Sequence, residues 1–576
     1  MSVSSSNSGT EGGSLVTFRI KAGGNVLPAS FEVLGITVTR EVNRIPTARL
    51  VCLDGDAAAQ DFALSASAQI QPGKDIEILA GYDSKDSTLF KGIVTRLRIR
   101  AGRQGSELII ECRDKCIALT TGRRCASYAG KTDSDNLKSL IQDAGLTAKV
   151  TATSVTHEDF VQFNATDWDF IVTRAEANGQ VVFVHDGVVT IDEPKAASAA
   201  DIELEYGANL FEFEAQIDAA PDTEDTWAES WSASTQAAQK QGSGTKYQLQ
   251  HGGARPSDEL SVWLKAVNDR ATLAQVRGRA QVQGRANVLP GQTAKFSGVG
   301  DTFSGKLLFI SAVEHQIAKG NWLTQVQVGL ATEWFHQRPQ VDQPPAGGLL
   351  PAVSGLQIGL VTKIDEDPQN EFRVQVQLPL VGSQAVIWAR MARLDAGAGR
   401  GVVFWPEIND EVVLGFLHSD PRDAVILGIL HSSKNASPIV ADPKNPQKGI
   451  TTRSKLQVLF DDEKKIITIA TPAGHSIALD EDAKTLTLTD LTKNTVTMSE
   501  SGVKIVSNKH SIELNAGGIE IISKGNLTLK ADGKVSIKGV NIEANADASF
   551  KAEGQTGAQV TTSGIAVLKG SLVQIN

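Results

Sequence analysis

The chain has 576 residues, enough for roughly three to five domains, which excludes a peptide hormone or a knottin. Acidic residues outnumber basic ones by 66 to 56, and the net charge of −10 leaves no basic excess to neutralise a nucleic-acid backbone. The four cysteines, Cys52, Cys112, Cys116 and Cys125, are too few to staple so long a chain, so we expect reduced thiols.

Residues 1–15 lack both a basic start and an apolar core, so we expect a flexible tail rather than a signal peptide. The longest apolar runs, such as residues 424–430, are much shorter than the roughly 20 residues that a membrane-spanning helix needs. We therefore expect the protein to be made and assembled in a bacterial cytoplasm and to leave it by a route other than a signal peptide.

Residues 16–345, here called the hub, mix strands with a few capped helices. Helices are predicted at 133–144, 166–178 and 257–276, the first two stopped by a glycine. The length predicts two subdomains, with 221–256 as an insertion or a mobile connection. Alternating apolar residues predict strands at 31–40, 49–53, 75–79, 88–100 and 107–112.

Residues 350–432 predict a small closed barrel. Five short strands and no convincing helix are typical of an OB-fold, the commonest five-stranded barrel. A linker is expected at 433–450. The five predicted strands are 357–364, 372–378, 386–390, 411–416 and 424–430.

Residues 451–576 differ in composition from the rest: acidic and basic residues balance, and Phe460 and Phe550 are the only aromatic residues. Short alternating bursts of Val, Ile and Leu predict strands with one buried face. From residue 519 onward the bursts recur every eight residues, with Gly517, Gly525 and Gly533 in step.

An eight-residue repeat is too short for one chain to close a solenoid, because a single-chain β-helix needs roughly 20 residues per coil. Three chains that each contribute one repeat per layer can close it. We therefore predict an intertwined homotrimeric β-helix over 451–576. The alternative is a meander of hairpins in a monomer, which would leave a long unprotected edge. The residues predicted to line the trimer axis are Ile519, Ile521, Leu527, Leu529, Val535 and Ile537.

Short motifs in the hub and the barrel, and the order of hub, barrel and repeat, resemble one family. The chain resembles the VgrG spike proteins of type VI secretion and related contractile injection systems, and it is similar to the fused hub and spike of contractile phage tails. The motifs lie at 46–50, 80–83, 89–94, 112–114 and 160–171 in the hub, and at 401–406, 409–416 and 420–428 in the barrel.

The resemblance implies a mainly β homotrimer whose hub meets the inner tube and baseplate proteins and whose β-helix pierces a target membrane. It also implies a PAAR-type tip protein, with effector cargo, docked on the final apolar residues Leu572, Val573 and Ile575. Phage spikes that digest peptidoglycan carry a lysozyme domain between barrel and β-helix, but the 433–450 linker has no room for one. The chain also ends without an effector domain, so we expect no enzymatic activity.

Four patterns that imitate chemical sites are interpreted as structural. Residues 129–132 resemble the end of a phosphate-binding loop, but no buried strand precedes them. Residues 397–401 resemble a dinucleotide loop but are followed by a strand, which indicates a turn. The acidic clusters 461–463 and 480–482 fit solvated turns better than Ca²⁺ sites. Cys112, Cys116 and Cys125 lack the paired spacing of a zinc site, so no catalytic residue, cofactor or metal is expected.

The main hypothesis is a trimeric, non-enzymatic spike that couples the machine to membrane puncture and to delivery of tip or cargo proteins, without a nucleic-acid partner. Two alternatives remain: a trimeric β-helical receptor-binding fibre, and a secreted carbohydrate-active enzyme. Whether the parent machine is type VI secretion, an extracellular phage-like particle or a phage stays open.

Overall fold

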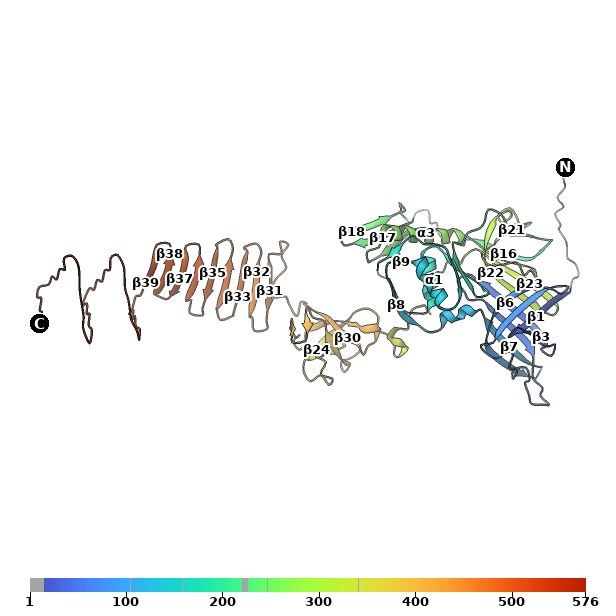
Figure 1. Cartoon of the computed structure of the whole chain (residues 1–576), viewed down its shortest axis with the longest axis horizontal. Coiled ribbons are helices and arrows are strands. Elements are labelled where there is room, and N and C mark those ends of the chain that lie inside the picture. Colours follow the sequence, from blue (N-terminus) through green and yellow to red (C-terminus); the bar gives the residue numbers. More distant parts are fainter. Residues whose placement is uncertain are drawn as a thin grey trace. The chain divides into compact units, whose positions relative to one another are not determined.

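The computed structural model describes residues 15–103, 105–158, 160–219, 226–245, 247–339 and 341–575, so all but the last residue of the tail expected at 1–15 lies outside it. The chain divides into two units, Met1–Ser354 with Phe416–Asp423, and Gly355–Gly415 with Ala424–Asn576 (Figure 1). Both are dominated by strands, which confirms the predicted mainly β fold class. Within the described ranges no helix is long and apolar enough to cross a membrane.

The first unit is built on a 13-stranded sheet with the path β16-β20-β23-β22-β3-β4-β7-β6-β5-β1-β2 and with β15 and β21 beside it. Its pairing of β3 with β22 joins segments that lie far apart in the sequence. All five strands predicted in this region are confirmed. The bounds are β1 Val16–Ala22, β2 Asn25–Val26, β3 Val33–Glu41, β4 Thr47–Leu53, β5 Asp75–Tyr82, β6 Lys85–Gly102, β7 Gly105–Arg113, β15 Ile202–Glu205, β16 Leu210–Ile217, β20 Val276–Gln283, β21 Thr293–Ser297, β22 Leu307–Ala318 and β23 Asn321–Val328.

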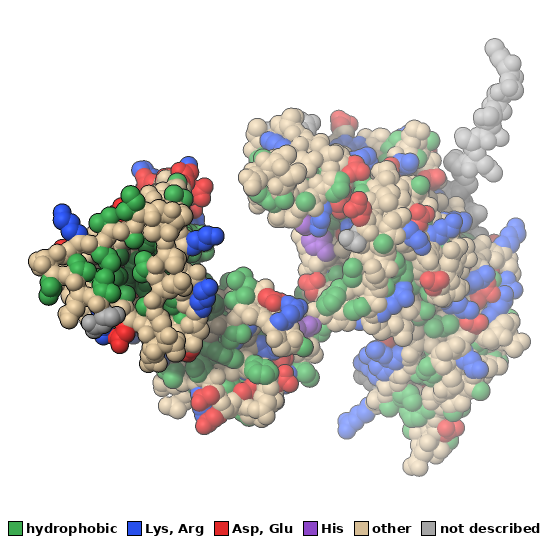
Figure 2. All heavy atoms as spheres, turned by 60° about the vertical axis from the view of Figure 1, so that its left-hand side comes forward, with side chains coloured by type: hydrophobic (Ala, Val, Ile, Leu, Met, Phe, Trp, Pro, Cys, Tyr) green, Lys and Arg blue, Asp and Glu red, His purple; other side chains and the backbone are tan. Residues whose placement is uncertain are grey.

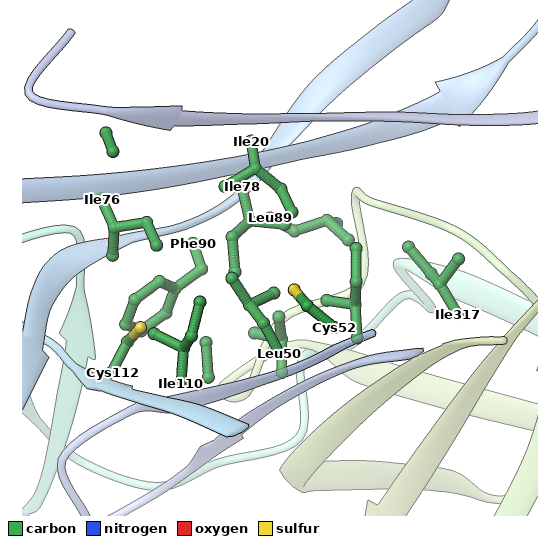
Figure 3. Packing of buried hydrophobic residues seen from close by; sticks show 14 of the residues in the cluster. Ile20, Leu50, Cys52, Ile76, Ile78, Leu89, Phe90, Ile110, Cys112 and Ile317 are labelled. Carbon is green, nitrogen blue, oxygen red and sulfur yellow. The ribbon is translucent and has the colours of Figure 1, made fainter. Parts of the chain in front are cut away.

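The sheet curls around a core formed by the inward residues of alternating strands. Ile20, Ile78 and Leu89 point across this core toward Leu50 and Ile110 (Figure 3). Cys52 and Cys112 belong to the same core, and burial raises the pKa of their thiols to about 11 and about 12. All four cysteines are free, and only Cys125 is exposed. Cys52, Cys112 and Cys116 are therefore small core residues, whereas Cys125 is not.

A smaller subdomain packs α1 Asp133–Asp143 and α2 Asp167–Ala177 near a three-stranded sheet of β10 Thr147–Val150, β13 Val181–His185 and β14 Val188–Asp192. Both predicted helices are confirmed, and each begins at a threonine cap. The Thr132 hydroxyl accepts from the Asp135 amide at 3.3 Å, and the Thr166 hydroxyl accepts from the Asp169 amide at 3.0 Å. Residues 129–132 therefore end in a helix cap. The smaller elements beside it are η1 Lys115–Thr120, β8 Arg124–Tyr128, β9 Lys131–Thr132, β11 Thr156–His157 and β12 Phe160–Ala165.

The segment expected to be an insertion or a mobile connection forms its own small sheet over its described residues. Strands β17 Thr226–Ser232, β18 Ala237–Gln241 and β19 Tyr247–His251 pack on α3 Ser257–Ala274, the third predicted helix. Ala228, Leu249 and Leu260 are buried between them. Sequence analysis missed this sheet because its outer strand, β18, carries mostly polar and small residues.

The second unit contains a closed five-stranded barrel with the order β24-β25-β26-β30-β29. The five predicted strands are confirmed as β24 Gln357–Lys363, β25 Val374–Gln377, β26 Val386–Met391, β29 Glu411–Phe416 and β30 Ala424–Leu430. Residues 397–401 form the turn between β27 Ala396–Gly397 and β28 Arg400–Gly401, also as predicted. The buried interior consists of Val361, Val374, Val376, Ala389, Val412, Leu414 and Ile426.

One buried carboxylate links several elements of the first unit. Glu176 on α2 is 4% exposed and accepts hydrogen bonds from Arg270 Nη1, Asn43 Nδ2 and the Phe335 amide, each at 2.7 Å. These partners lie on α3, after β3 and on η2 Phe335–Gln337. A buried charge that keeps all its partners is tolerated, whereas the same site with one partner missing is costly.

We expect Glu176→Ala to lower the free energy of unfolding of the first unit by about 3–5 kcal/mol, because it leaves the Arg270 guanidinium buried without a counter-charge. The matched control is Glu214→Ala, which removes an ion pair with Arg279 that is exposed on both sides and should cost less than about 1 kcal/mol. Urea unfolding followed by tryptophan fluorescence measures both, since residues 447–576 contain no tryptophan. Equal costs would refute the role given to Glu176.

A second buried group makes the stability of this unit depend on pH. His315 on β22 is 1% exposed, and its Nδ1 lies 2.9 Å from the Thr324 hydroxyl. Burial, aided by the nearby charge of Arg40, lowers the pKa of His315 to about 3. Below its ordinary pKa of about 6.5, the unfolded chain binds a proton that the folded protein does not. The contribution of His315 to stability is therefore complete above that value and is lost as the pH falls from about 6.5 toward about 3.

We expect His315→Asn, which places an amide near the position of Nδ1, to remove this pH dependence. Between pH 7 and pH 4 the wild type should lose stability faster than the variant, by at most about 1.4 kcal/mol per pH unit for the single proton. Urea unfolding at a series of pH values gives the difference between the two proteins. Parallel pH profiles would contradict a neutral, buried His315.

Candidate assembly interface

Nine strands after the barrel, here called the tail sheet, form one antiparallel meander in which each strand pairs with the next. Up to Ile522 the chain therefore folds back on itself, which differs from the intertwined winding expected over 451–576. The bounds are β31 Gln447–Thr451, β32 Gln457–Asp461, β33 Ile466–Ala470, β34 Ser476–Asp480, β35 Thr485–Thr489, β36 Thr495–Ser499, β37 Gly502–Ser507, β38 His510–Asn515 and β39 Gly518–Ile522.

The eight-residue repeat explains this difference. From β37 onward each strand starts eight residues after the previous one, as at Gly502, His510 and Gly518. Ser507 pairs with His510, so only two residues turn the chain, and Asn508 adopts the positive φ of 53° that such turns require. A six-residue strand and a two-residue turn also make eight residues. The same repeat thus fits a hairpin as well as one layer of a coil.

One face of the tail sheet carries two continuous columns of apolar residues, here called the apolar ladder. Cross-strand register sets each member beside the next: Ile477 pairs with Leu488, and Leu479 with Leu486. The first column contains Phe460, Ile467, Leu479, Leu486, Met498, Val503, Leu514 and Ile519, and the second Val458, Ile469, Ile477, Leu488, Val496, Ile505, Ile512 and Ile521.

The opposite face of the tail sheet is suited to water. Its central column begins at Leu459 and continues through Thr468, Ala478, Thr487 and Thr497 to Lys504 and then to two glutamates. Lys504 Nζ lies 3.1 Å from the Glu513 carboxylate across the strands. Because strand residues alternate between faces, the sheet is apolar on one side and polar on the other.

Nothing in the part of the chain that the structure describes covers the apolar ladder. Exposure of its members reaches 48% at Ile521 and 71% at Ile519. A hollow of about 580 Å³ lies on this face, lined by Ile469, Ile477, Leu488 and other residues. Figure 2 shows hydrophobic side chains inside the hollow of the tail and charged side chains outside it. A contiguous apolar surface of this kind marks an interface rather than a water-facing side.

Residues 523–575, here called the octad segment, form no strand in the described chain, and all of them after Ser523 are exposed. In Figure 1 this segment runs as open turns beyond β39. Of the residues predicted on the trimer axis, Ile519 and Ile521 end the two columns of the apolar ladder. The other four, Leu527, Leu529, Val535 and Ile537, lie in the octad segment with 55–71% of their surface exposed.

The final apolar residues are exposed as well: Leu572 by 82%, Val573 by 49% and Ile575 by 81%. The structure places them in the octad segment, apart from any strand of the chain. Sequence analysis assigned axis positions only from residue 519 onward and so missed the upstream ladder from Val458 to Leu514. The alternation of apolar residues in runs such as 466–469 predicts these strands, but it does not predict that their apolar residues lie on one common face.

The acidic cluster at 461–463 is neutralised within the chain by lysines. Asp461 accepts from the Lys464 amide at 3.0 Å, and this hydrogen bond lowers the pKa of its carboxyl. Asp462 pairs with Lys448, and Glu463 Oε1 lies 3.1 Å from Lys444 Nζ. The cluster is therefore a charged turn of the tail sheet.

The cluster at 480–482 is also a turn. Asp480 accepts from the Ala483 amide at 2.8 Å, and Asp482 lies 2.8 Å from Lys465 Nζ. Across the part of the chain that the structure describes, no group of three or more His, Cys, Asp or Glu residues is placed to hold a metal ion.

Solved structures similar to this chain come from phage-related tails and type VI secretion. A tail protein of Neisseria meningitidis is 13% identical, with a TM-score of 0.43 over 57% of this chain and 99% of that one. Another is an Escherichia coli component of the type VI secretion system that is described as structurally similar to the T4 tail proteins gp27 and gp5. It is 13% identical, with a TM-score of 0.41 over 71% of this chain and 99% of that one. The Francisella PdpA–VgrG complex is 11% identical, with a TM-score of 0.35 over 89% of this chain and 88% of that one. All three TM-scores are too low to support a conclusion.

Two families match the sequence directly, whereas no curated protein matches it. The type VI secretion system/phage-baseplate injector OB domain matches residues 357–431, which form the closed barrel. The Alg8 N-terminal domain matches residues 12–245 and 240–319, more than half of the chain. The injector OB domain confirms the expected resemblance to the spike proteins of contractile injection systems. The chain belongs to the family of the Alg8 N-terminal domain, and its barrel matches the type VI secretion system/phage-baseplate injector OB domain.

Proposed function

We propose that this protein is the trimeric, non-enzymatic central spike of a contractile injection machine. In this role the hub meets the inner tube and baseplate proteins, and the tail transmits the thrust that pierces a target membrane. The observation that carries the proposal is the apolar ladder, a two-column face that none of the described residues of its own chain covers.

The octad segment favours three copies over two. Two tail sheets packed face to face would cover both ladders, about 10 Å apart. Two chains would, however, supply only about 16 residues per layer of the octad segment, below the roughly 20 that a β-helical coil needs. Three chains supply about 24, so three tail sheets form a triangular prism that the octad segments continue as an intertwined coil.

A prism of this kind suits a mechanical role. Its axis would be filled with Ile, Leu and Val, its outer faces would be polar, and its turns would be short. Chains wound around one another must unthread before they separate, so resistance to pulling would be kinetic. We propose that the machine is assembled in the bacterial cytoplasm and that the spike leaves the cell as part of the contractile particle.

The proposed lack of enzymatic activity agrees with the structural roles of the sequence patterns that imitate chemical sites. Thr132 caps a helix, residues 397–401 turn a hairpin, and the acidic turns at 461–463 and 480–482 hold lysines. We propose that any effector activity resides in cargo or in a tip protein. The injector OB domain favours this role over a receptor-binding fibre or a secreted carbohydrate-active enzyme.

We expect Ile521→Asp to prevent trimer formation, because it would bury three carboxylates on one axis at a cost of several kcal/mol each. Glu520→Lys is the matched control on the polar face. Glu520 pairs with Glu513, so the lysine replaces a like-charge pair with an opposite one and should leave assembly intact. Light scattering after size exclusion gives the mass of each variant. Equal behaviour of the two would refute the assignment of faces.

We further propose that Leu572, Val573 and Ile575 form a blunt apolar end on which a PAAR-type tip protein docks. Deletion of residues 572–576 should then abolish co-purification with the tip protein while the trimer remains. The control is Lys569→Ala, a polar change just before the docking residues. A truncated trimer that binds the tip protein with unchanged affinity would place the docking surface elsewhere.

A further inference from the structure

A hollow of about 400 Å³ in the first unit brings together three arginines from distant parts of the chain. Arg44 lies in the turn after β3, Arg113 ends β7, and Arg338 follows η2. Thr47 and Thr120 add hydroxyl groups to the lining. This hollow is here called the arginine pocket.

The arginine pocket has a local excess of positive charge in a chain of net charge −10. The one carboxylate in its lining, that of Glu41, lies 2.8 Å from Arg44 Nε and is thus already paired. Among the residues that the structure describes, no carboxylate lies within ion-pair distance of Arg113 or Arg338. The Arg338 guanidinium instead lies over the Phe335 ring, 5.0 Å from its centroid. Two guanidinium groups therefore remain available to an anionic ligand.

The walls of the pocket are fixed before any ligand arrives. Trp168 and Phe335 are 5% and 6% exposed, and Glu176 holds the Phe335 amide and the Asn43 side chain. At Gly92 a Cβ atom would lie 2.2 Å from the Arg113 carbonyl oxygen, so the backbone beside this arginine is closely packed. A rigid pocket loses little conformational freedom on binding, which favours affinity.

Three of the motifs that carry the family resemblance meet at this pocket. Thr47 comes from the motif at 46–50, Arg113 from that at 112–114 and Trp168 from that at 160–171. Core packing accounts for the buried Trp168. It does not account for Arg113, whose side chain is exposed and has no acidic partner in the described structure.

We propose that the arginine pocket binds an acidic peptide segment of a partner protein, with a carboxylate held between Arg113 and Arg338. The planar fork of a guanidinium matches a carboxylate with two parallel hydrogen bonds. Thr47 in the lining can contribute a hydroxyl to the peptide backbone, whereas the Thr120 hydroxyl already donates to the Ile117 carbonyl oxygen at 2.8 Å and can only accept; the volume accommodates one or two residues. This site is separate from the apolar ladder, and the proposal goes beyond the proposed function without depending on tail assembly.

The test is isothermal titration of the full-length protein with acetylated, amidated pentapeptides of the form Gly-Glu-X-Glu-Gly, where X is Leu, Ser or Phe. We expect at least one of them to bind, its glutamine counterpart to bind at least tenfold more weakly, and added salt to weaken binding. Arg113→Gln and Arg338→Gln should each weaken binding about tenfold, and the double Arg→Glu variant should abolish it. The matched control is Arg98→Glu, an exposed arginine on β6 outside the pocket, which should bind as the wild type does.

Several results would overturn the proposal. These are no binding of any acidic peptide to the wild type, equal binding of the glutamine counterparts, or unchanged binding by the double variant. Binding of inorganic phosphate without binding of the peptides would instead assign a small-anion site. A change in oligomeric mass in the two single glutamine variants would assign the pocket to a contact between copies of this chain.

Discussion

The apolar ladder is the constraint on which the tail depends. Sixteen side chains in two columns share one face of a sheet, and the chain, as far as the structure describes it, supplies nothing to cover them. The hydrophobic effect makes such a surface costly in water. The opposite face is mostly polar, and further copies of the same apolar face would provide a matching cover. Trimer formation is in this view part of how the tail folds rather than a later step.

The hub and the barrel, by contrast, bury their apolar residues within one chain. Pairing of β3 with β22 lets segments from both ends of the hub share one sheet and one core. The barrel closes its sheet and so removes its edges, with Val361, Val376 and Leu414 fully buried inside. The protein thus joins two self-sufficient parts to a tail that has no core of its own. That division agrees with the proposed role as a spike.

Local signals predicted much of this fold. Glycine stops marked the ends of the first two helices, and alternating residues located the barrel strands and the strands β3 to β7. The pairing of the tail could not be predicted, because eight residues fit both a six-residue strand with a two-residue turn and one layer of a three-chain coil. Axis residues Ile519 and Ile521 were predicted, but the ladder above them depends on a register that only the pairing defines. The Glu176 network and the arginine pocket join residues far apart in sequence, for which no local pattern exists.

Native mass spectrometry of the full-length protein tests the central claim most directly. Three copies of a 61.2 kDa chain give a mass of about 184 kDa, and the account predicts this species even at low protein concentration. The reason is that three copies cover the apolar ladder and also supply the roughly 20 residues per layer that the octad segment needs to close a coil. A stable, soluble monomer of 61.2 kDa, or a dimer, would show that the apolar ladder is covered in some other way and would contradict the account.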